Sequence, residues 1–364
     1  MSSSSASSSL YLFTTSQTPL PPRYPHPSKP KLILPSLVHR TLHNSLDGDT
    51  PSISFDHGSG KGTVIIPHPD GLVKHDLPSS NNSTSQSQSQ SHNPSPNGNE
   101  IPENGLSDEP SKYLVDSELT VKLHLVSPSS PSNYLERVKE SLGILEKFKG
   151  LSKEKVDTLL IGFKGVDYKG KKTETDSDLN SQADGDREYT IDKQLESTIL
   201  DTWKEILEEQ RLVGEQTKLG SLYSPLNLLK QLVSSSQGKG DVKGIKVNAL
   251  DTPDCHHLPK EYTGYARGEG VELWAGGGGE GSDPLPSPHL HNLLQEFSSK
   301  LSSLTGGTID SSLLGKLIGV DGDGLEFEKR GAVDVRWVLS YTLVSKTRNV
   351  VKDKGYIVAA DLYP

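Results

Sequence analysis

The stretch from Ile245 to Pro286 contains a strand–helix–strand unit, which constrains the fold more than any other part of the chain. Residues 245–250 alternate apolar and polar side chains, as a strand does, and residues 271–275 predict a second strand. Between them, residues 259–267 predict a helix that a proline opens. Two strands joined by one helix pair in parallel through a right-handed crossover. The sequence therefore predicts a parallel sheet covered by helices.

The alternation of strands and helices continues from Tyr113 onward. Strands are predicted at 118–126, 157–163, 217–222 and 355–360, and helices at 133–145, 194–212, 225–233, 289–301 and 333–341. Roughly 250 residues in this order favour a (β/α)8 TIM-type barrel, incomplete or decorated, over an open sheet. Because neither a Gly-x-Gly-x-x-Gly nor a Walker pattern follows a strand, no Rossmann site or P-loop is predicted.

The chain divides by composition into residues 1–111 and the barrel at 112–364. The first part is rich in Ser, Pro and Asn and is expected to be largely disordered, because residues 79–99 hold no large apolar side chain. Two short pieces, Lys31–Leu37 and Ser52–Pro67, have strand character, and they could contribute the first strands of a barrel or an edge hairpin. Within the barrel, 169–188 and the Gly/Asp-rich 319–324 are expected to be surface loops.

Composition excludes several classes of partner. The net charge of −9 does not suit a phosphate backbone, so no nucleic acid is expected, and no apolar run is long enough to span a bilayer. A single cysteine rules out an internal disulfide framework and fits a reducing compartment, so we expect a cytoplasmic location. The Ser-rich, acid-poor start before Asp47 leaves an organelle transit peptide as the alternative to a disordered tail.

Three stretches resemble the aldo-keto reductase superfamily: Lys155–Ile161 (KVDTLLI), Lys218–Ser221 (KLGS) and Tyr265–Leu273 (YARGEGVEL). The order of further segments, VKLHLV, WKEILEEQRLVG and the tail Lys346–Ile357 (KTRNVVKDKGYI), resembles the family of glutamate–cysteine ligase modifier subunits within it. The resemblance covers about residues 113–364, with a fainter match at His39–Asn44.

This resemblance implies a barrel of the aldo-keto reductase type and a non-catalytic regulatory subunit. Such a subunit would form a heterodimer with the catalytic subunit of glutamate–cysteine ligase, the ATP-dependent enzyme of the first step of glutathione biosynthesis. It would raise the enzyme's affinity for glutamate and relieve its feedback inhibition by glutathione. The alternative is an NADP-dependent aldo-keto reductase-type oxidoreductase, since the same fold carries that chemistry.

Reductase activity in this superfamily needs a tyrosine acid, a lysine, an aspartate and a histidine. Gly162 occupies the histidine position, and Lys122 matches the lysine. The window 81–110, which should supply the aspartate and the tyrosine, holds no such pair, and Tyr113 and Asp116 stand in the wrong order. A lone lysine cannot both polarise a carbonyl and deliver a proton, so we expect no reductase turnover.

The resemblance places Lys346 and Arg348 where such barrels can hold the 2′-phosphate of NADP(H). The other interpretation of this pair, and the one we favour, is a solvated basic face. We therefore expect that no cofactor is required, and residual NADP(H) binding at these two residues is left open.

The segment Asp254-Cys255-His256-His257 holds the only cysteine. Cysteine and histidine are zinc ligands, but adjacent side chains diverge and no second cluster completes a site, so no metal is predicted. A histidine-activated thiol is disfavoured because neighbours in a loop rarely face each other. The segment lies at a strand-to-helix junction, where barrels place functional loops, so we expect these four residues to form a protein interface. The resemblance makes Cys255 a candidate for a disulfide to the catalytic subunit, and a buried, inert thiol is the alternative.

Overall fold

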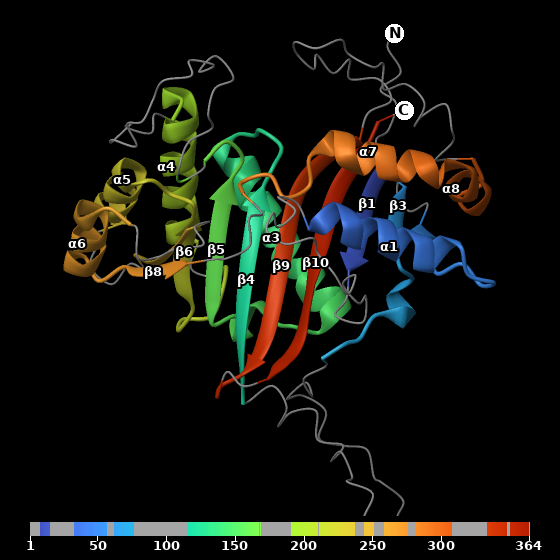
Figure 1. Ribbon diagram of the computed structural model, residues 1–364, viewed down its shortest axis with the longest axis horizontal. Coiled ribbons are helices and arrows are strands. Elements are labelled where there is room, and N and C mark those ends of the chain that lie inside the picture. Colours follow the sequence, from blue (N-terminus) through green and yellow to red (C-terminus); the bar gives the residue numbers. More distant parts are fainter. Residues whose placement is uncertain are drawn as a thin grey trace, which may run out of the picture.

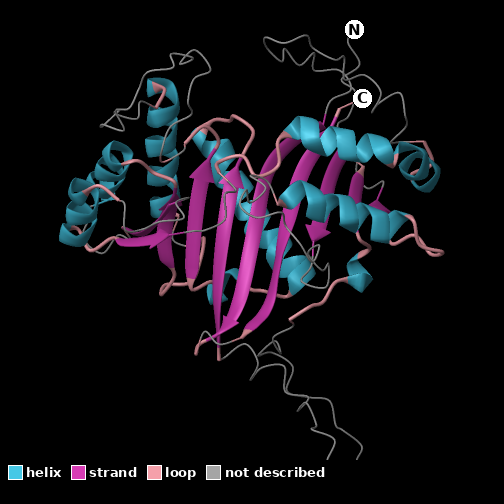
Figure 2. Ribbon diagram, viewed as in Figure 1, coloured by secondary structure: helices cyan, strands magenta, loops and turns pink. Residues whose placement is uncertain are grey.

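The protein is described here by a computed structural model, in which a ten-stranded mixed sheet carries helices on both faces (Figure 1, Figure 2). The description covers residues 8–14, 33–56, 62–75, 116–166, 168, 191–209, 211–236, 244–250, 258–275, 281–307, 333–347 and 350–363. The predicted loops at 169–188 and 319–324 lie outside these residues.

The elements alternate between strands and helices over most of the described chain. The strands are β1 (Ser8–Thr14), β2 (Ser54–Asp56), β3 (Thr63–Ile66), β4 (Ser117–Leu125), β5 (Thr158–Phe163), β6 (Lys218–Leu222), β7 (Ile245–Leu250), β8 (Glu272–Ala275), β9 (Val333–Ser345) and β10 (Val351–Leu362). The helices are α1 (Leu34–Leu46), α3 (Pro131–Lys149), α4 (Lys193–Glu208), α5 (Leu226–Ser236), α6 (Lys260–Gly268), α7 (Ser287–Glu296) and α8 (Ser298–Leu304), with short 3₁₀ turns η2 (Pro69–Gly71) and η3 (Lys153–Lys155).

The sheet has a parallel half and a mainly antiparallel half. Its strand order is β2-β3-β1-β10-β9-β4-β5-β6-β7-β8, and β4 to β8 run parallel in chain order. The predicted unit at 245–275 is confirmed, because β7 and β8 pair in parallel across α6. β9 is antiparallel to both β4 and β10, and β10 is antiparallel to β1.

The sheet is open, so the expected (β/α)8 barrel is not confirmed. β8 and β2 are its two ends, and these strands do not pair with each other in the described part of the chain. A closed barrel of this type needs parallel strands throughout. Here the position beside β4 is taken by an antiparallel strand, β9, and three further strands continue the sheet on that side.

The helix predicted at 333–341 is wrong, because these residues begin β9, the longest strand. Val333, Val335, Trp337, Leu339 and Tyr341 are buried. The side chains between them at 334, 336 and 340 are half-buried. This alternation has the period of two that a strand requires. β-Branched and aromatic residues at these positions also favour extended backbone.

In the N-terminal region, one of the two segments with predicted strand character is a helix, and the other forms strands. The strand predicted at Lys31–Leu37 is wrong: α1 begins at Leu34, and Pro35 lies in its first turn. The buried positions of α1 follow helical spacing, and they are Leu34, Leu37, Val38, Thr41, Leu42, Ser45 and Leu46. Of the two roles left open for residues 52–67, the structure shows the edge hairpin, since β2 and β3 pair antiparallel at one end of the sheet.

Strand β1 was not predicted, yet it lies inside the sheet, between β3 and β10. Leu10 and Leu12 pack on one face of the sheet, while Phe13 packs on the other. Because β1 has a neighbouring strand on each side, the segment at 8–14 belongs to the same sheet as residues 117–362.

The two faces of the sheet are covered by different helices. One face packs against α3, α4, α5 and α6, and a core of 39 buried residues fills that layer, with Trp203 and Trp337 as its largest members. The other face is covered over β9, β10, β1 and β3 by α1, α7 and α8, which lie in front of the sheet in Figure 1. The predicted helix at 289–301 is split into α7 and α8 at Phe297.

The remaining helices agree with the sequence within a few residues. Helix α3 begins at Pro131, two residues before the predicted start, and Ser130 is its N-cap, whose Oγ accepts from the backbone N–H of Asn133. Gly150 ends α3 with a φ of 66°, a left-handed conformation that glycine adopts without strain. None of the helices that the structure describes is both long and apolar enough to cross a membrane.

We predict that Gly220→Ala lowers the free energy of unfolding by roughly 1–3 kcal/mol, since overpacking in a close-packed core costs about this much. A Cβ built on Gly220 lies 2.5 Å from the carbonyl oxygen of Val247 and 2.6 Å from Cδ2 of Leu160. Chemical denaturation would measure the loss.

The control is Gly264→Ala within α6, where a Cβ meets nothing within 4 Å. Removing a mid-helix glycine should stabilise the protein by about 0.5–1 kcal/mol. Equal effects of the two substitutions would contradict the packing described for β5, β6 and β7.

Candidate functional site

The carboxyl ends of β4 to β7 meet at one edge of the sheet, which we call the carboxyl edge. Parallel α/β folds bind their ligands at this edge. Buried polar residues near it include His124 on β4, Ser221 on β6, Tyr223 and Ser224 after β6, Asn248 on β7 and Tyr262 on α6. This group is the candidate functional site.

Asn248 holds the turn that follows β6. Its Oδ1 accepts from the Ser221 hydroxyl at 2.8 Å and from the backbone N–H of Ser224 at 3.3 Å. Its Nδ2 donates to the carbonyl of Ser224 at 2.9 Å and to the Tyr262 hydroxyl. Tyr262 donates in turn to the Ser224 carbonyl at 2.7 Å, and burial raises the pKa of this phenol, so it remains a neutral donor.

The turn held by Asn248 places Tyr223 in an unusual conformation. Tyr223 has a φ of 61°, the left-handed region that bulky residues rarely adopt. Its N–H donates to the carbonyl of Ala249 at 2.7 Å, which fixes the backbone there. As a result the Tyr223 hydroxyl lies 3.2 Å from Nε2 of His124, with the two rings 5.9 Å apart.

His124 and Tyr223 form a packed polar contact rather than an open reaction centre. Burial, with a smaller effect of the Lys122 charge, lowers the pKa of His124 to about 3, so its imidazole is neutral at physiological pH. A neutral imidazole bonded to a phenol could take part in proton transfer. However, His124 is 0% exposed and Tyr223 is 5% exposed, which leaves a substrate no direct access to either group.

Residues 281–286, which follow β8 and lead into α7, cross the carboxyl edge. The Ser282 hydroxyl accepts from the backbone N–H of Gly165 at 3.2 Å, and Asp283 pairs with Lys164 at 3.0 Å. Leu285 is fully buried in the core under α1 and α7. The chain itself therefore occupies the rim immediately after β5.

The structure leaves no room for a histidine at Gly162. A Cβ built there lies 2.9 Å from Cβ of Leu222, and whole side chains reach further. In the register of β4 and β5, Gly162 lies opposite His124, and Lys122 lies opposite Leu160. Lys122 is half-buried and makes no ion pair with a carboxylate in the described part of the chain.

The structure separates Lys346 from the carboxyl edge. Lys346 follows the end of β9, and its N–H donates to the carbonyl of Asp116 just before β4. It therefore lies at the amino ends of the parallel strands, where it lines a cavity of about 320 Å³ together with Lys155, Glu154 and Asp157. Arg348 and the predicted interface, Asp254, Cys255, His256 and His257, lie outside the described residues.

A second polar group contains the same four residue types as a reductase tetrad, and sequence reasoning missed it. The Asp353 carboxylate accepts from Tyr341 at 3.1 Å and from His75 at 2.8 Å, and the Lys149 ammonium lies 3.2 Å away. The four residues come from β10, β9, the segment after η2, and the end of α3. Their separation in sequence, from 75 to 353, leaves no local pattern to recognise.

This group, which we call the Asp353 cluster, has the wrong electrostatics for reductase chemistry. Burial and the neighbouring Asp353 charge raise the pKa of Tyr341, whereas a catalytic tyrosine needs a lowered pKa. Burial lowers the pKa of Lys149, and Asp353 opposes that effect. The Lys149 and Asp353 side chains are 1% and 6% exposed, so the cluster is a structural contact between α3 and the sheet.

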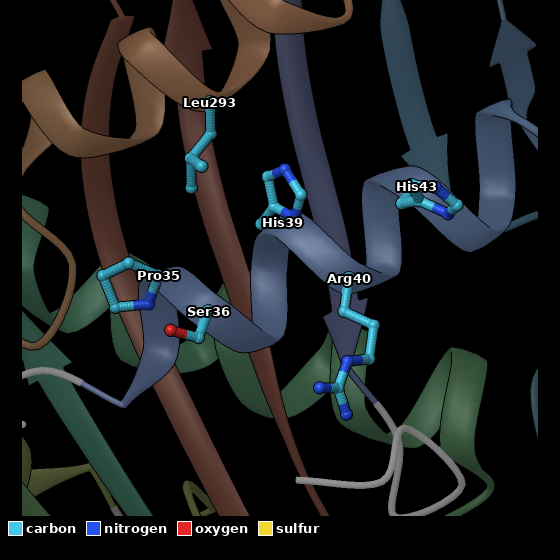
Figure 3. A pocket seen from close by; sticks show the side chains of 6 residues that line it. All are labelled: Pro35, Ser36, His39, Arg40, His43 and Leu293. Atoms are coloured by element: carbon cyan, nitrogen blue, oxygen red, sulfur yellow. The ribbon is translucent and has the colours of Figure 1, made fainter. Parts of the chain in front are cut away.

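A surface groove lies between α1 and α7 (Figure 3). Figure 3 shows His39 directed toward Leu293 of α7, while Arg40 points away along the other side of α1. His39 already pairs with Glu296 at 3.2 Å, and His43 with Asp47 at 3.4 Å. Because these basic side chains diverge, the groove does not gather them around one ligand.

The described residues contain no group of three or more His, Cys, Asp or Glu side chains that could hold a metal ion. In comparisons with known proteins, no protein-family model, no curated protein and no solved structure matches this chain.

We predict that Asp353→Asn destabilises the protein by about 3–5 kcal/mol at neutral pH, because it leaves the Lys149 charge buried without a partner. Burial alone would raise the pKa of Asp353, but the His75 hydrogen bond and the Lys149 charge lower it overall. A lowered folded-state pKa contributes stability above the unfolded value of about 4, and this stability is lost as the pH falls further.

Urea denaturation at several pH values would measure both effects. The wild type should lose stability steadily below about pH 4, and the loss should be smaller in Asp353→Asn. Asp201→Asn on α4, an exposed position, is the matched control and should change neither stability nor its pH dependence. Equal behaviour of the two variants would contradict the role given to the cluster.

Proposed function

We propose that this chain is a non-catalytic regulatory subunit of glutamate–cysteine ligase, on an incomplete barrel of the aldo-keto reductase type. It binds the catalytic subunit as a heterodimer, raises that enzyme's affinity for glutamate and relieves feedback inhibition by glutathione. The observation that carries the proposal is the packing of Gly162 against Leu222, because it excludes a histidine from the position where a reductase of this type orients its substrate.

Two further observations support a role without chemistry. Lys122 has no partner carboxylate in the described chain, so nothing there tunes it for a tyrosine acid. Where lysine, aspartate, tyrosine and histidine do meet, around Asp353, they are buried between α3 and the sheet. The partner in this proposal comes from the resemblance of residues 113–364 to modifier subunits. The proposal also includes a cytoplasmic location and no required cofactor.

The alternative, an NADP-dependent reductase, is favoured by one observation only. Lys122, His124 and Tyr223 lie near each other at the carboxyl edge, which brings three of the four residue types of a tetrad together. The contact of His124 with Tyr223 is buried, however, and residues 281–286 cover the adjoining rim. The regulatory role therefore remains the proposal.

We predict that adding this chain to the ligase catalytic subunit lowers the KM for glutamate and weakens inhibition by glutathione, while kcat for the fully saturated enzyme changes less. Binding that stabilises a glutamate-competent conformation would produce this pattern. Initial rates at varied glutamate, with and without the chain, measure it, and heat-denatured chain is the control.

An unchanged KM, together with NADPH oxidation by the chain alone on simple aldehydes, would contradict the proposal and support the reductase. In that case Lys122→Ala should abolish the oxidation.

We predict that Cys255→Ser removes a covalent heterodimer band on a non-reducing gel and leaves the reversible complex in place. Cys255 is the only thiol that this chain can contribute to a disulfide. Ser234→Ala on the exposed side of α5 is a control that should leave the band unchanged. A band of equal intensity in Cys255→Ser would rule out a disulfide through Cys255.

A further inference from the structure

The cavity of about 320 Å³ at the amino ends of the parallel strands, which we call the amino-edge cavity, has no role in the site described above. It is lined by the start of β4, by residues around η3, by residues 216–217 before β6, and by the end of β9 with Lys346 after it. In Figure 1 the start of β4 and the end of β9 lie at the foot of the sheet, away from α7 and α8. The volume is at the lower end of the range of about 300–1,000 Å³ that small-molecule sites occupy, so the cavity suits a small ligand.

Charged side chains of both signs line the amino-edge cavity in equal number. Lys155 and Lys346 are basic, Glu154 and Asp157 are acidic, and all four are exposed. Within the part of the chain that the structure describes, none of the four forms an ion pair, so each lysine nitrogen lies more than 4.0 Å from the carboxylate oxygens. Opposite charges that face one cavity without pairing leave room for a ligand that carries both signs.

The backbone around these charged residues is fixed by hydrogen bonds. Oδ2 of Asp157 accepts from the N–H of Leu119 at 2.7 Å, which ties this carboxylate to β4. The N–H of Lys346 donates to the backbone just before β4 at 2.9 Å, and the N–H of Lys155 donates to the carbonyl of Ser152 at 2.9 Å. A site that is ordered in advance loses less entropy when it binds a ligand.

Aliphatic side chains form the inner wall of the cavity. Leu119, Leu151, Val156 and Leu343 line it and belong to the core between the sheet and α3. These four residues are buried whereas the four charged ones are exposed, so the charges lie nearer to solvent. The amino-edge cavity therefore offers charged partners at its mouth and apolar carbon atoms behind them.

We propose that the amino-edge cavity binds a small zwitterion, an α-amino acid with an aliphatic side chain. The two lysines donate to its carboxylate, Glu154 and Asp157 accept from its ammonium group, and its side chain lies against the aliphatic wall. A simple anion would be repelled by the two carboxylates and a simple cation by the two lysines. This inference goes beyond the proposed function and does not depend on it, because it involves no contact with the ligase.

Isothermal titration of the full chain with L-leucine tests the ligand class. Leucine should bind saturably. 4-Methylpentanoic acid lacks the ammonium group and 3-methylbutylamine lacks the carboxylate, so each should bind about tenfold more weakly or worse, because it loses charge-assisted hydrogen bonds. No binding of leucine at millimolar concentration would overturn the inference, and so would an analogue that binds as tightly as leucine.

Two variants test whether leucine binds in this cavity. Lys155→Gln with Lys346→Gln removes the partners of the carboxylate, and Glu154→Gln removes one partner of the ammonium group. Each should weaken leucine binding by about fivefold or more, since a neutral hydrogen bond replaces a charge-assisted one. If both variants bind leucine as tightly as the wild type, the site lies elsewhere and the inference is overturned.

The matched controls lie on α4, where Lys193, Lys204 and Asp201 are exposed. Lys193→Gln with Lys204→Gln and Asp201→Asn make the same chemical changes outside the cavity, and their dissociation constants should stay within about twofold of the wild type. A control that weakens binding as much as the cavity variants would overturn the assignment to the cavity.

Thermal unfolding gives a second measurement on the same proteins. Leucine should raise the unfolding midpoint of the wild type and of the controls, and should raise it less in the cavity variants at the same concentration. The unfolding curve also shows whether each variant is folded. Because the lysine variant and Glu154→Gln are independent, the loss of one to misfolding leaves the other as the test. Equal shifts in the wild type and in the folded cavity variants would contradict the inference.

Discussion

The fold depends on the long hairpin of β9 and β10 in the middle of the sheet. β9 pairs with β4, the first strand of the parallel half, and β10 pairs with β1 of the N-terminal half. Asp353 on β10 binds Lys149, His75 and Tyr341, so one buried carboxylate joins the hairpin to α3 and to the segment after η2. Removing one partner of such a buried ion pair costs several kcal/mol, because the other charge stays in a region of low polarity.

The hairpin also explains why a parallel arrangement does not continue around a barrel. Once β9 runs antiparallel beside β4, the next strands extend the sheet away from β8. Helices α1, α7 and α8 then cover the face of β9, β10, β1 and β3. The carboxyl edge carries polar groups, as it does in other α/β folds. Here, however, Asn248, Tyr262 and Ser221 form hydrogen bonds that hold the turn at Tyr223.

Local sequence patterns predicted the parallel half of the sheet well. They failed where the paired strands lie far apart in the sequence. Residues 159–163 have no polar side chain because both faces of β5 are buried, and the apolar residues of α3 are spaced for one face. Each pattern could therefore be predicted from neighbours in sequence. The prediction for β9 was wrong because the alternating strand–helix order of a barrel suggested a helix there. The apolar residues Val333, Val335 and Trp337 in fact occupy alternate positions, as in a strand. β1 lies among serines and prolines, and its pairing with β10, some 350 residues away, has no local signal. The Asp353 cluster was missed for a similar reason, because His75 and Asp353 are 278 residues apart. Gly162 was singled out only through the resemblance, which assigns a role to that position.

The central claim is that this chain acts by binding the ligase catalytic subunit rather than by chemistry of its own. Its most direct test is the mass of the assembly in an equimolar mixture of the two purified chains, measured by light scattering after size exclusion. The account predicts a peak with the mass of one copy of each chain, together with a fall in KM for glutamate in the same fraction. Two separate peaks at the masses of the isolated chains, with an unchanged KM, would contradict it.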